Sequence, residues 1–297
     1  MEFRPYGIIP AVVTPFHADE QLNEEALAAL VANLISDGVH GVFVLGSQGE
    51  YYSLTTDEKR RVIEIAVAAA SGMVPVYAGT GANTTREAVA LTRMAETAGA
   101  DAVSVITPSF ITPSQDELYE HYRAVAAATR LPVLIYSNPG RTGVQVSVEL
   151  ARRLAQVRNI VGIKESSGDL SITAEFIHNT PATFHVCAGR DTLILATLLY
   201  GGTGAVAASG NVAACHLVRL YQAYLDGDME TARATQAAII PLRAAFALGT
   251  FPSVIKEALN MIGLDVGQCR SPVGPLSCEA RKQLQAVLEN MGLLAHR

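Results

Sequence analysis

The chain has 297 residues, of which 49% are hydrophobic and only 17% charged, so it can bury a large core as one α/β barrel or as two domains. A net charge of −6 argues against nucleic acid as a partner. No apolar stretch approaches the ~20 residues of a membrane span, and the apolar run near the N-terminus is too short for a signal peptide. With four scattered cysteines that suit reduced thiols, we expect a cytoplasmic protein without membrane contact.

Short apolar runs alternate along the chain with amphipathic, alanine-rich segments whose apolar residues recur at three and four, as in a helix. The predicted strands are Ile8–Val13, Gly41–Leu45, Val74–Ala78, Ala102–Ile106, Val133–Tyr136, Ile160–Lys164, Phe184–Cys187 and Ala205–Ala207. The predicted helices are Glu24–Ser36, Thr56–Ala70, Thr85–Ala98, Gln115–Thr129, Val148–Gln156, Leu170–His178, Thr192–Leu199 and Ala213–Leu225. Thr56 and Ser114, each followed by acidic residues, are predicted to cap two of these helices.

Regular alternation of strands and helices predicts parallel strands joined by right-handed crossovers. The natural closure of eight such units is a (β/α)8 TIM barrel. A doubly wound open sheet is the alternative, but it more often carries a glycine fingerprint after the first strand, where this chain reads Val12-Val13-Thr14-Pro15. We predict a barrel over residues 1–225 and a C-terminal helical region over residues 226–297.

Lys164 closes the predicted strand Ile160–Lys164, and active sites of TIM barrels lie at the C-terminal ends of the strands. Alternation places Ile160, Gly162 and Lys164 on one face and Val161 and Ile163 on the other. If the second pair faces the helices, Lys164 points into the barrel. The alternative is a lysine that extends from the strand end to solvent.

Tyr136 is the last residue of the preceding predicted strand, as Lys164 is of the next one. We therefore expect the two side chains in the same barrel mouth. Burial there lowers the pKa of an amine toward neutrality, and a neutral amine can attack a ketone to form an imine. A phenol within hydrogen-bond reach can move the protons that this reaction requires. Taken alone, Tyr136 can equally be an aromatic residue at the barrel rim.

Other motifs give weaker indications. Gly46 and Gly49 bracket Ser47 and Gln48 in a loop that can present N–H groups and a hydroxyl to a carboxylate. Most such loops are simply turns. The histidines are dispersed and show no HxH or HExxH spacing, so we expect no metal site.

Five stretches, GSQGE, AGTGAN, TPSFITPSQ, YSNPGRTG and GIKESSGD, together identify a resemblance over nearly the whole chain. The order and spacing of these stretches resemble those of the dihydrodipicolinate synthase/N-acetylneuraminate lyase family. The resemblance implies a (β/α)8 barrel with a C-terminal helical region, assembled as a homotetramer from two dimers. It also implies a carbon–carbon lyase that joins or cleaves small molecules, pyruvate or another 2-oxo acid and an aldehyde, through a lysine imine without a cofactor.

The resemblance assigns roles to individual residues. Lys164 matches the imine-forming lysine, and Tyr136 matches the tyrosine that relays protons beside it. Ser47 and Gln48 occupy the pair that contacts the carboxylate of the 2-oxo acid, and Ser47 is grouped with the catalytic residues. Gln48 departs from the family, because its members commonly carry Thr-Thr or Ser-Thr at this pair.

Arg141 matches the arginine with which dihydrodipicolinate synthases hold the carboxylate of the second substrate, and Gly189 and Val206 match positions that line the same pocket. In those synthases the loop read here as TPSFITPSQ usually carries two tyrosines, the second of which reaches the neighbouring subunit's active site. Ser109 and Phe110 stand there instead. Phe110 can fill space near the substrate but cannot carry a proton.

Three interpretations follow. The first is a pyruvate-dependent aldolase acting on a 2-keto-3-deoxy sugar acid or a similar compound, or a related dehydratase or deaminase. The second is a 4-hydroxy-tetrahydrodipicolinate (dihydrodipicolinate) synthase that tolerates Phe110. The third is a barrel without activity, which the presence of both Lys164 and Tyr136 disfavours. The sequence favours the first interpretation.

Overall fold

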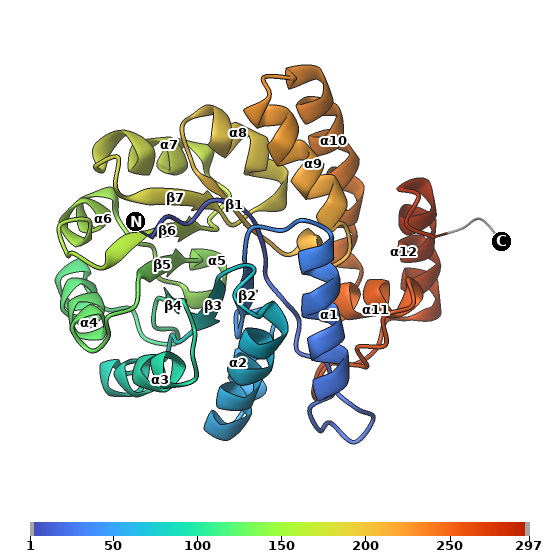
Figure 1. The fold of residues 1–297 in the computed structure, drawn as a ribbon, viewed down its shortest axis with the longest axis horizontal. Coiled ribbons are helices and arrows are strands. Elements are labelled where there is room, and N and C mark those ends of the chain that lie inside the picture. The colour runs from blue at the N-terminus through green and yellow to red at the C-terminus, as the bar shows by residue number, and fades with distance from the viewer. Residues whose placement is uncertain (1–2, 295–297) are drawn as a thin grey trace.

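The computed structural model describes residues 3–294 and shows eight parallel strands surrounded by helices (Figure 1). The strands are hydrogen-bonded in the order β1-β8-β7-β6-β5-β4-β3-β2. A single bridge between Ala11 and Phe43 joins the two ends of this order, so the barrel is nearly closed. The predicted TIM barrel is therefore confirmed, and the open doubly wound sheet is excluded.

The strands agree with the predicted runs to within a few residues at each end. They are β1 (Gly7–Pro10), β2 (Val42–Val44), β3 (Val76–Gly79), β4 (Ala102–Ile106), β5 (Val133–Ser137), β6 (Ile160–Glu165), β7 (His185–Ala188) and β8 (Gly204–Ala207). The helices of the barrel are α1 (Glu24–Ser36), α2 (Thr56–Ala70), α3 (Thr85–Thr97), α4 (Gln115–Ala127), α5 (Pro139–Thr142), α6 (Val148–Leu154), α7 (Leu170–Asn179), α8 (Ile194–Leu199) and α9 (Ala214–Leu225).

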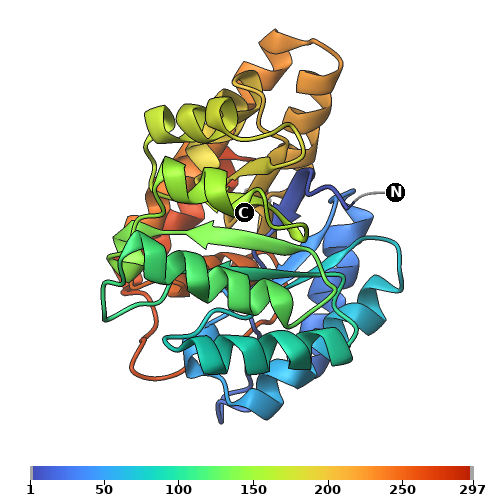
Figure 2. The same cartoon turned by 90° about the vertical axis from the view of Figure 1, so that its left-hand side faces the viewer.

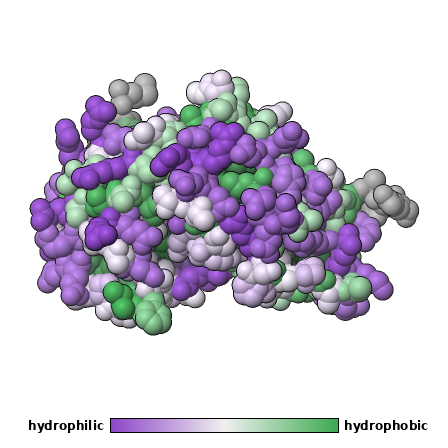
Figure 3. Space-filling model, turned by 90° about the horizontal axis from the view of Figure 1, so that it is seen from below, coloured by the Kyte–Doolittle hydropathy of each residue, from purple (hydrophilic) through white to green (hydrophobic). Residues whose placement is uncertain are grey.

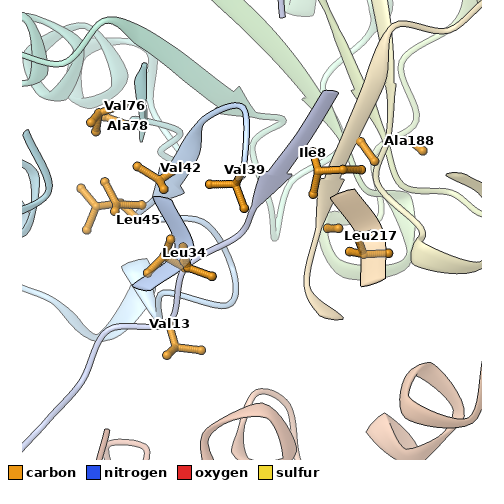
Figure 4. Close-up of a cluster of buried hydrophobic side chains, with 14 of the residues drawn as sticks. Ile8, Val13, Leu34, Val39, Val42, Leu45, Val76, Ala78, Ala188 and Leu217 are labelled. Carbon is orange, nitrogen blue, oxygen red and sulfur yellow. The ribbon is translucent and has the colours of Figure 1, made fainter. Parts of the chain in front are cut away.

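The period-two alternation of the strands produces two apolar layers. The outer layer packs strand residues such as Ile8 and Val42 against helix residues such as Leu217 and Leu34, as Figure 4 illustrates. The inner layer is smaller and contains Ile9, Ala11, Phe43, Tyr77, Ala102, Leu134, Cys187 and Val206. Because these side chains fill the barrel, space for a ligand remains only at its mouth.

The structure corrects one predicted helix cap and confirms the other. Helix α2 is capped by Thr55, whose side chain and Glu58 form a reciprocal capping box, and Thr56 is the first helical residue. Thr55 is the cap because the reciprocal bonds need an acidic residue three positions later, which is Glu58 for Thr55 but Lys59 for Thr56. Ser114 caps α4 as predicted, with Glu117 as its partner.

The predicted alternation along β6 is wrong at its first residue. Ile160 belongs to the outer layer together with Ile163. The register between β5 and β6 shifts at Val133/Leu134, so that Val133 pairs with Ile160 but Leu134 pairs with Gly162. The extra residue in β6 reverses the faces before Gly162, whereas the remaining pairs of the strand keep a regular register.

The last part of the chain forms α10 (Met229–Ala245), α11 (Ser253–Met261) and α12 (Cys278–Asn290), beside the barrel in Figures 1 and 2. Helix α10 packs along α9 and also contacts the short helices Asp191–Leu193 and Ser209–Asn211, which follow β7 and β8. The C-terminal helices therefore reach the loops of the barrel mouth. The division at residue 225 stays a prediction.

Figure 3 shows one face of the molecule, on which hydrophilic side chains predominate and hydrophobic ones form small groups. Within residues 3–294, no single helix has the length and apolarity needed to cross a bilayer. The segments Met229–Leu248 and Ser253–Met261 reach them only as a pair, with a bend of 119° between them.

Candidate active site

Lys164 and Tyr136 lie side by side on β6 and β5, where they form a register pair. The Lys164 Nζ atom is 4.0 Å from the centroid of the Tyr136 ring and 4.8 Å from the centroid of the Phe43 ring. Lys164 is only 4% exposed, so it does not extend to solvent. The neighbouring strand ends thus bring an amine and a phenol into one mouth.

Burial lowers the pKa of Lys164, because the charged ammonium loses its hydration, and the nearby Tyr136 opposes this only in part. Lys164 forms no ion pair with an acidic residue in the part of the chain that the structure describes. A buried amine without a carboxylate partner has an increased neutral fraction at neutral pH. The neutral amine is the form that attacks a carbonyl carbon.

Tyr136 is held by two polar neighbours. Its hydroxyl oxygen accepts a hydrogen bond from Nδ2 of Asn138 at 2.9 Å and lies 3.5 Å from Oγ of Ser47. Burial alone raises the pKa of Tyr136, but the positive charge of Lys164 and these hydrogen bonds outweigh it, so the pKa is lowered. With Asn138 as a donor, the phenol keeps its own proton for another acceptor.

The loop that carries Ser47 and Gln48 has an unusual backbone at both ends. Leu45 and Glu50 have φ values of 59° and 51°, in the left-handed region that non-glycine residues seldom adopt. Both loop side chains are nearly buried, and Oε1 of Gln48 has no hydrogen-bond partner among the described residues. This carbonyl oxygen can accept a hydrogen bond from a ligand, and the side chain can bind a carboxylate only through its NH2 group.

A pocket of about 390 Å³ opens over Lys164. Its wall combines strand ends of the barrel with residues of the C-terminal helices. The lining residues are Ala11, Ser47, Gln48, Tyr136, Asn138, Gly140, Arg141, Lys164, Ser166, Gly189, Arg190, Asp191, Val206, Ala208, Arg243, Phe246, Ala247 and Phe251. Within residues 3–294, no three His, Cys, Asp or Glu side chains gather as a metal-binding group.

Gly189 is required at its position by space. A Cβ atom there would lie 1.8 Å from Oγ of Ser166 and 2.7 Å from the backbone oxygen of Glu165. Both distances are far below van der Waals contact, so any side chain would displace the wall of the pocket beside Lys164.

All but one of the predicted site residues line this pocket. Phe110 does not: its side chain is 99% exposed, and its backbone φ is 72°. The preceding Ser109 is tied to Asn83, since both its backbone N–H and its hydroxyl donate to Oδ1 of Asn83. A contact of Phe110 with another chain stays a prediction.

Sequence reasoning missed several residues of the pocket. Asn138 lies in the quoted stretch YSNPGRTG, so its place two residues after Tyr136 was an available signal. Arg190 directly follows Gly189 and gave no motif of its own. Arg243 and Phe251 come from the C-terminal helical region, where no local pattern distinguishes a residue that faces the pocket from one on the surface.

Comparison with known sequences gives a consistent result. The profile of the Dihydrodipicolinate synthetase family matches residues 4–291. The chain is 41% identical over 281 residues to 4-hydroxy-tetrahydrodipicolinate synthase 1 of Halalkalibacterium halodurans, covering 95% of each chain. It is 40% identical over 296 residues to the 4-hydroxy-tetrahydrodipicolinate synthase of Methanopyrus kandleri, covering 99% of each chain.

Solved structures agree with these sequences. Dihydrodipicolinate synthase from Thermotoga maritima superposes with a TM-score of 0.95 at 34% identity, covering 97% of this chain and 99% of that one. YagE of Escherichia coli K12, a prophage protein of the dihydrodipicolinic acid synthase family, was solved in complex with pyruvate. It superposes with a TM-score of 0.94 at 36% identity and with the same coverage.

Proposed function

Since the chain belongs to the dihydrodipicolinate synthetase family, and is thereby a Schiff-base-forming lyase that needs no metal or other cofactor, we propose that it is a 4-hydroxy-tetrahydrodipicolinate synthase. In this reaction pyruvate is condensed with aspartate semialdehyde. The names of the relatives at about 40% identity favour this synthase over the sugar-acid aldolase that the sequence alone favoured.

The proposed reaction begins at Lys164. The neutral amine attacks the carbonyl carbon of pyruvate, and loss of one water molecule gives the imine. Loss of a proton from the methyl group converts the imine to an enamine, whose carbon attacks the aldehyde. The amino group of the bound acceptor then attacks the imine carbon and displaces the Lys164 amine, which closes the ring, releases the cyclic product and consumes no further water.

We assign the remaining roles from the geometry. Tyr136 moves the protons of imine formation, because its hydroxyl is oriented by Asn138 and its ring contacts the Lys164 amine. Ser47 and Gln48 hold the carboxylate of pyruvate, and Arg141 at the pocket rim holds that of the second substrate. Gly189 and Val206 shape the wall between them.

The observation that carries the proposal is a buried lysine with a lowered pKa and no acidic partner in the described chain, in contact with a tyrosine. Borohydride reduction in the presence of pyruvate should add one pyruvyl group to the protein, and peptide mapping should place it on Lys164. Coupled assays should then show consumption of aspartate semialdehyde. An unmodified mass, or an adduct on another lysine, would contradict the assignment of Lys164.

A sugar-acid aldolase is the second candidate, and Phe110 is the observation that favours it. Where the synthases carry a second tyrosine, this chain presents an apolar ring. The homotetramer and the cytoplasmic location also remain expectations from the resemblance. A panel of aldehydes with pyruvate, assayed in wild type and Phe110→Tyr, separates the two functions. A gain of tenfold or more from a low base with aspartate semialdehyde alone would favour the aldolase for the wild type.

A further inference from the structure

Two arginines of the pocket are partly buried without a counterion. Among residues 3–294, the arginines that are not exposed are Arg153, Arg190, Arg243 and Arg270. Arg153 pairs with Asp116 at 2.6 Å, and Arg270 pairs with Glu58. Arg190 and Arg243 form no ion pair in this part of the chain, although the charge of Asp191 acts on Arg243. Because a guanidinium loses hydration on burial, both positions are favourable for an anion from outside.

Arg190 and Arg243 line the same pocket as Arg141 and Lys164, although they come from distant parts of the chain. Arg190 follows β7, whereas Arg243 lies in the last turn of α10. Burial lowers the pKa of Arg243. The negative charge of Asp191 opposes this shift, whereas the positive charges of Arg190 and Arg141 add to it, so the three guanidinium groups lie close enough to act on one another.

Asp191 is the one acidic residue among the described residues that line the pocket, and both of its carboxylate oxygens already accept hydrogen bonds from the protein. Oδ1 of Asp191 accepts a hydrogen bond from the N–H of Ala208 at 3.1 Å. Its Oδ2 accepts from the N–H of Ser209 at 3.0 Å and from the Ser209 hydroxyl at 2.6 Å. Asp191 is 1% exposed and, within residues 3–294, forms no ion pair with an arginine. The rim of the pocket thus keeps an excess of positive charge.

The three guanidinium groups are held in place by contacts that leave donors free. Cζ of Arg141 lies 3.6 Å from the centroid of the Phe251 ring, and Cζ of Arg243 lies 4.8 Å from that of Phe246. Arg190 donates from Nε to the backbone oxygen of Ser166 at 3.2 Å and from Nη2 to that of Ser167 at 3.4 Å, which leaves the Nη1 group free. Stacking on a ring occupies the face of a guanidinium, so its N–H edge can still bind a carboxylate or a phosphate.

We infer that Arg190 and Arg243 form, together with Arg141, an anion subsite that selects acceptor aldehydes carrying a carboxylate or phosphate group. Ser47 and Gln48 are buried, whereas Arg141 is exposed and Arg190 and Arg243 are half-buried, so we assign the carboxylate of pyruvate to the first pair and the anionic group of the acceptor to the arginines. The inference deepens the proposed function and rests on it in one respect, that an aldehyde enters the pocket after the imine has formed.

The kinetic test compares acceptors that differ in charge. Initial rates are measured at saturating pyruvate with aspartate semialdehyde and its methyl ester, and with glyceraldehyde 3-phosphate and glyceraldehyde. Arg243→Gln and Arg190→Gln should each lower kcat/KM for the charged acceptors at least tenfold. The values for the two acceptors without an anionic group, and the KM of pyruvate, should change less than threefold. Arg233→Gln, an exposed arginine of the same helix, is the control and should behave as wild type.

A binding test keeps the inference independent of the proposed acceptor. Enzyme whose Lys164 has been reduced with pyruvate and borohydride is titrated by calorimetry with succinate and with inorganic phosphate. Tighter binding of one identifies the kind of anion, and a tenfold weaker binding in Arg243→Gln supports the subsite even if aspartate semialdehyde is not turned over. Equal losses for acceptors with and without an anionic group, or anion binding that is unchanged in both variants or absent in wild type, would overturn it.

Discussion

Two lysines are buried, Lys164 in the barrel mouth and Lys256 at the junction between α11 and the loop after β2. The polar groups around their amines differ. Lys256 in α11 is 1% exposed, pairs with Glu50 at 2.6 Å and donates to the backbone oxygen of Gln268 at 2.9 Å. Lys164 in the mouth is 4% exposed, lies against the rings of Tyr136 and Phe43, and forms no ion pair within residues 3–294. Burial lowers the pKa of both, but Glu50 opposes this at Lys256. A buried lysine therefore suggests chemistry only where the counterion is missing.

The junction also fixes the loop that serves the mouth. Glu50 directly follows Gly49, and its second carboxylate oxygen accepts from the N–H of Arg270 at 3.1 Å. The Arg270 guanidinium pairs with Glu58 and donates to the backbone oxygen of Ser53 at 2.8 Å. The ion pairs of the junction thus hold both ends of the segment after Ser47 and Gln48, while the lysine of the mouth stays free to react.

The largest effect is expected at Lys164. Lys164→Met should lower kcat about 10⁴-fold or more, because it removes the nucleophile itself, and should abolish borohydride trapping of pyruvate. Steady-state assays and intact mass spectrometry measure the two effects. Lys282→Met, at an exposed lysine, is the control. A pyruvyl adduct that persists in Lys164→Met would show that another amine forms the imine.

Lys256→Met should instead destabilise the fold. Removing one partner of a buried ion pair leaves the Glu50 carboxylate uncompensated, which typically costs about 3–5 kcal/mol. Lys164→Met should leave the free energy of unfolding unchanged or raise it, because an unpaired buried amine is replaced by an apolar chain of similar length. Urea unfolding of both variants measures the difference. Equal losses of stability would mean that the two lysines do not differ in the way described.

Tyr136→Phe tests the second residue of the Lys164–Tyr136 pair by removing its hydroxyl group. Loss of a positioned acid–base group should lower kcat about 10²- to 10⁴-fold and leave the KM of pyruvate close to the wild-type value. Tyr77→Phe is the matched control, since Tyr77 is a buried tyrosine of the inner barrel layer that does not line the pocket. A Tyr136→Phe enzyme with wild-type kcat would show that another group moves the protons.

The smallest effect is expected at Glu58 in the junction. Hydrogen bonds from Arg270 lower the pKa of Glu58 to about 2, well below the ~4.3 of an unfolded chain. Its contribution to stability is therefore present above pH ~4.3 and is lost as the pH falls toward 2. Glu58→Gln should cost about 1.5–3 kcal/mol at pH 7, and this difference should shrink between those two pH values. Denaturant unfolding at pH 7 and pH 3 measures it, and a pH-independent difference would contradict the assignment.

The sequence alone determined the barrel and the central pair of the site. Strands of a TIM barrel follow one another in chain order, and side chains alternate along each strand, so two residues that end consecutive strands must meet at the mouth. Lys164 and Tyr136 satisfy this local rule. The rule failed at Ile160, because the register shift beside Val133 depends on the pairing of two strands and leaves no mark in either one.

Tertiary structure alone decided what surrounds that pair. Arg243 and Phe251 reach the pocket because α10 packs on the loops after β7 and β8, and the residues in contact lie far apart along the chain. Whether a buried lysine has a counterion is likewise a property of long-range packing: Glu50 and Lys256 form an ion pair across the junction, whereas in the described chain no acidic residue forms an ion pair with Lys164, and Asp191 acts on it only through its charge. Periodicity follows from local backbone geometry, whereas hydration and charge at a site depend on every segment that packs around it.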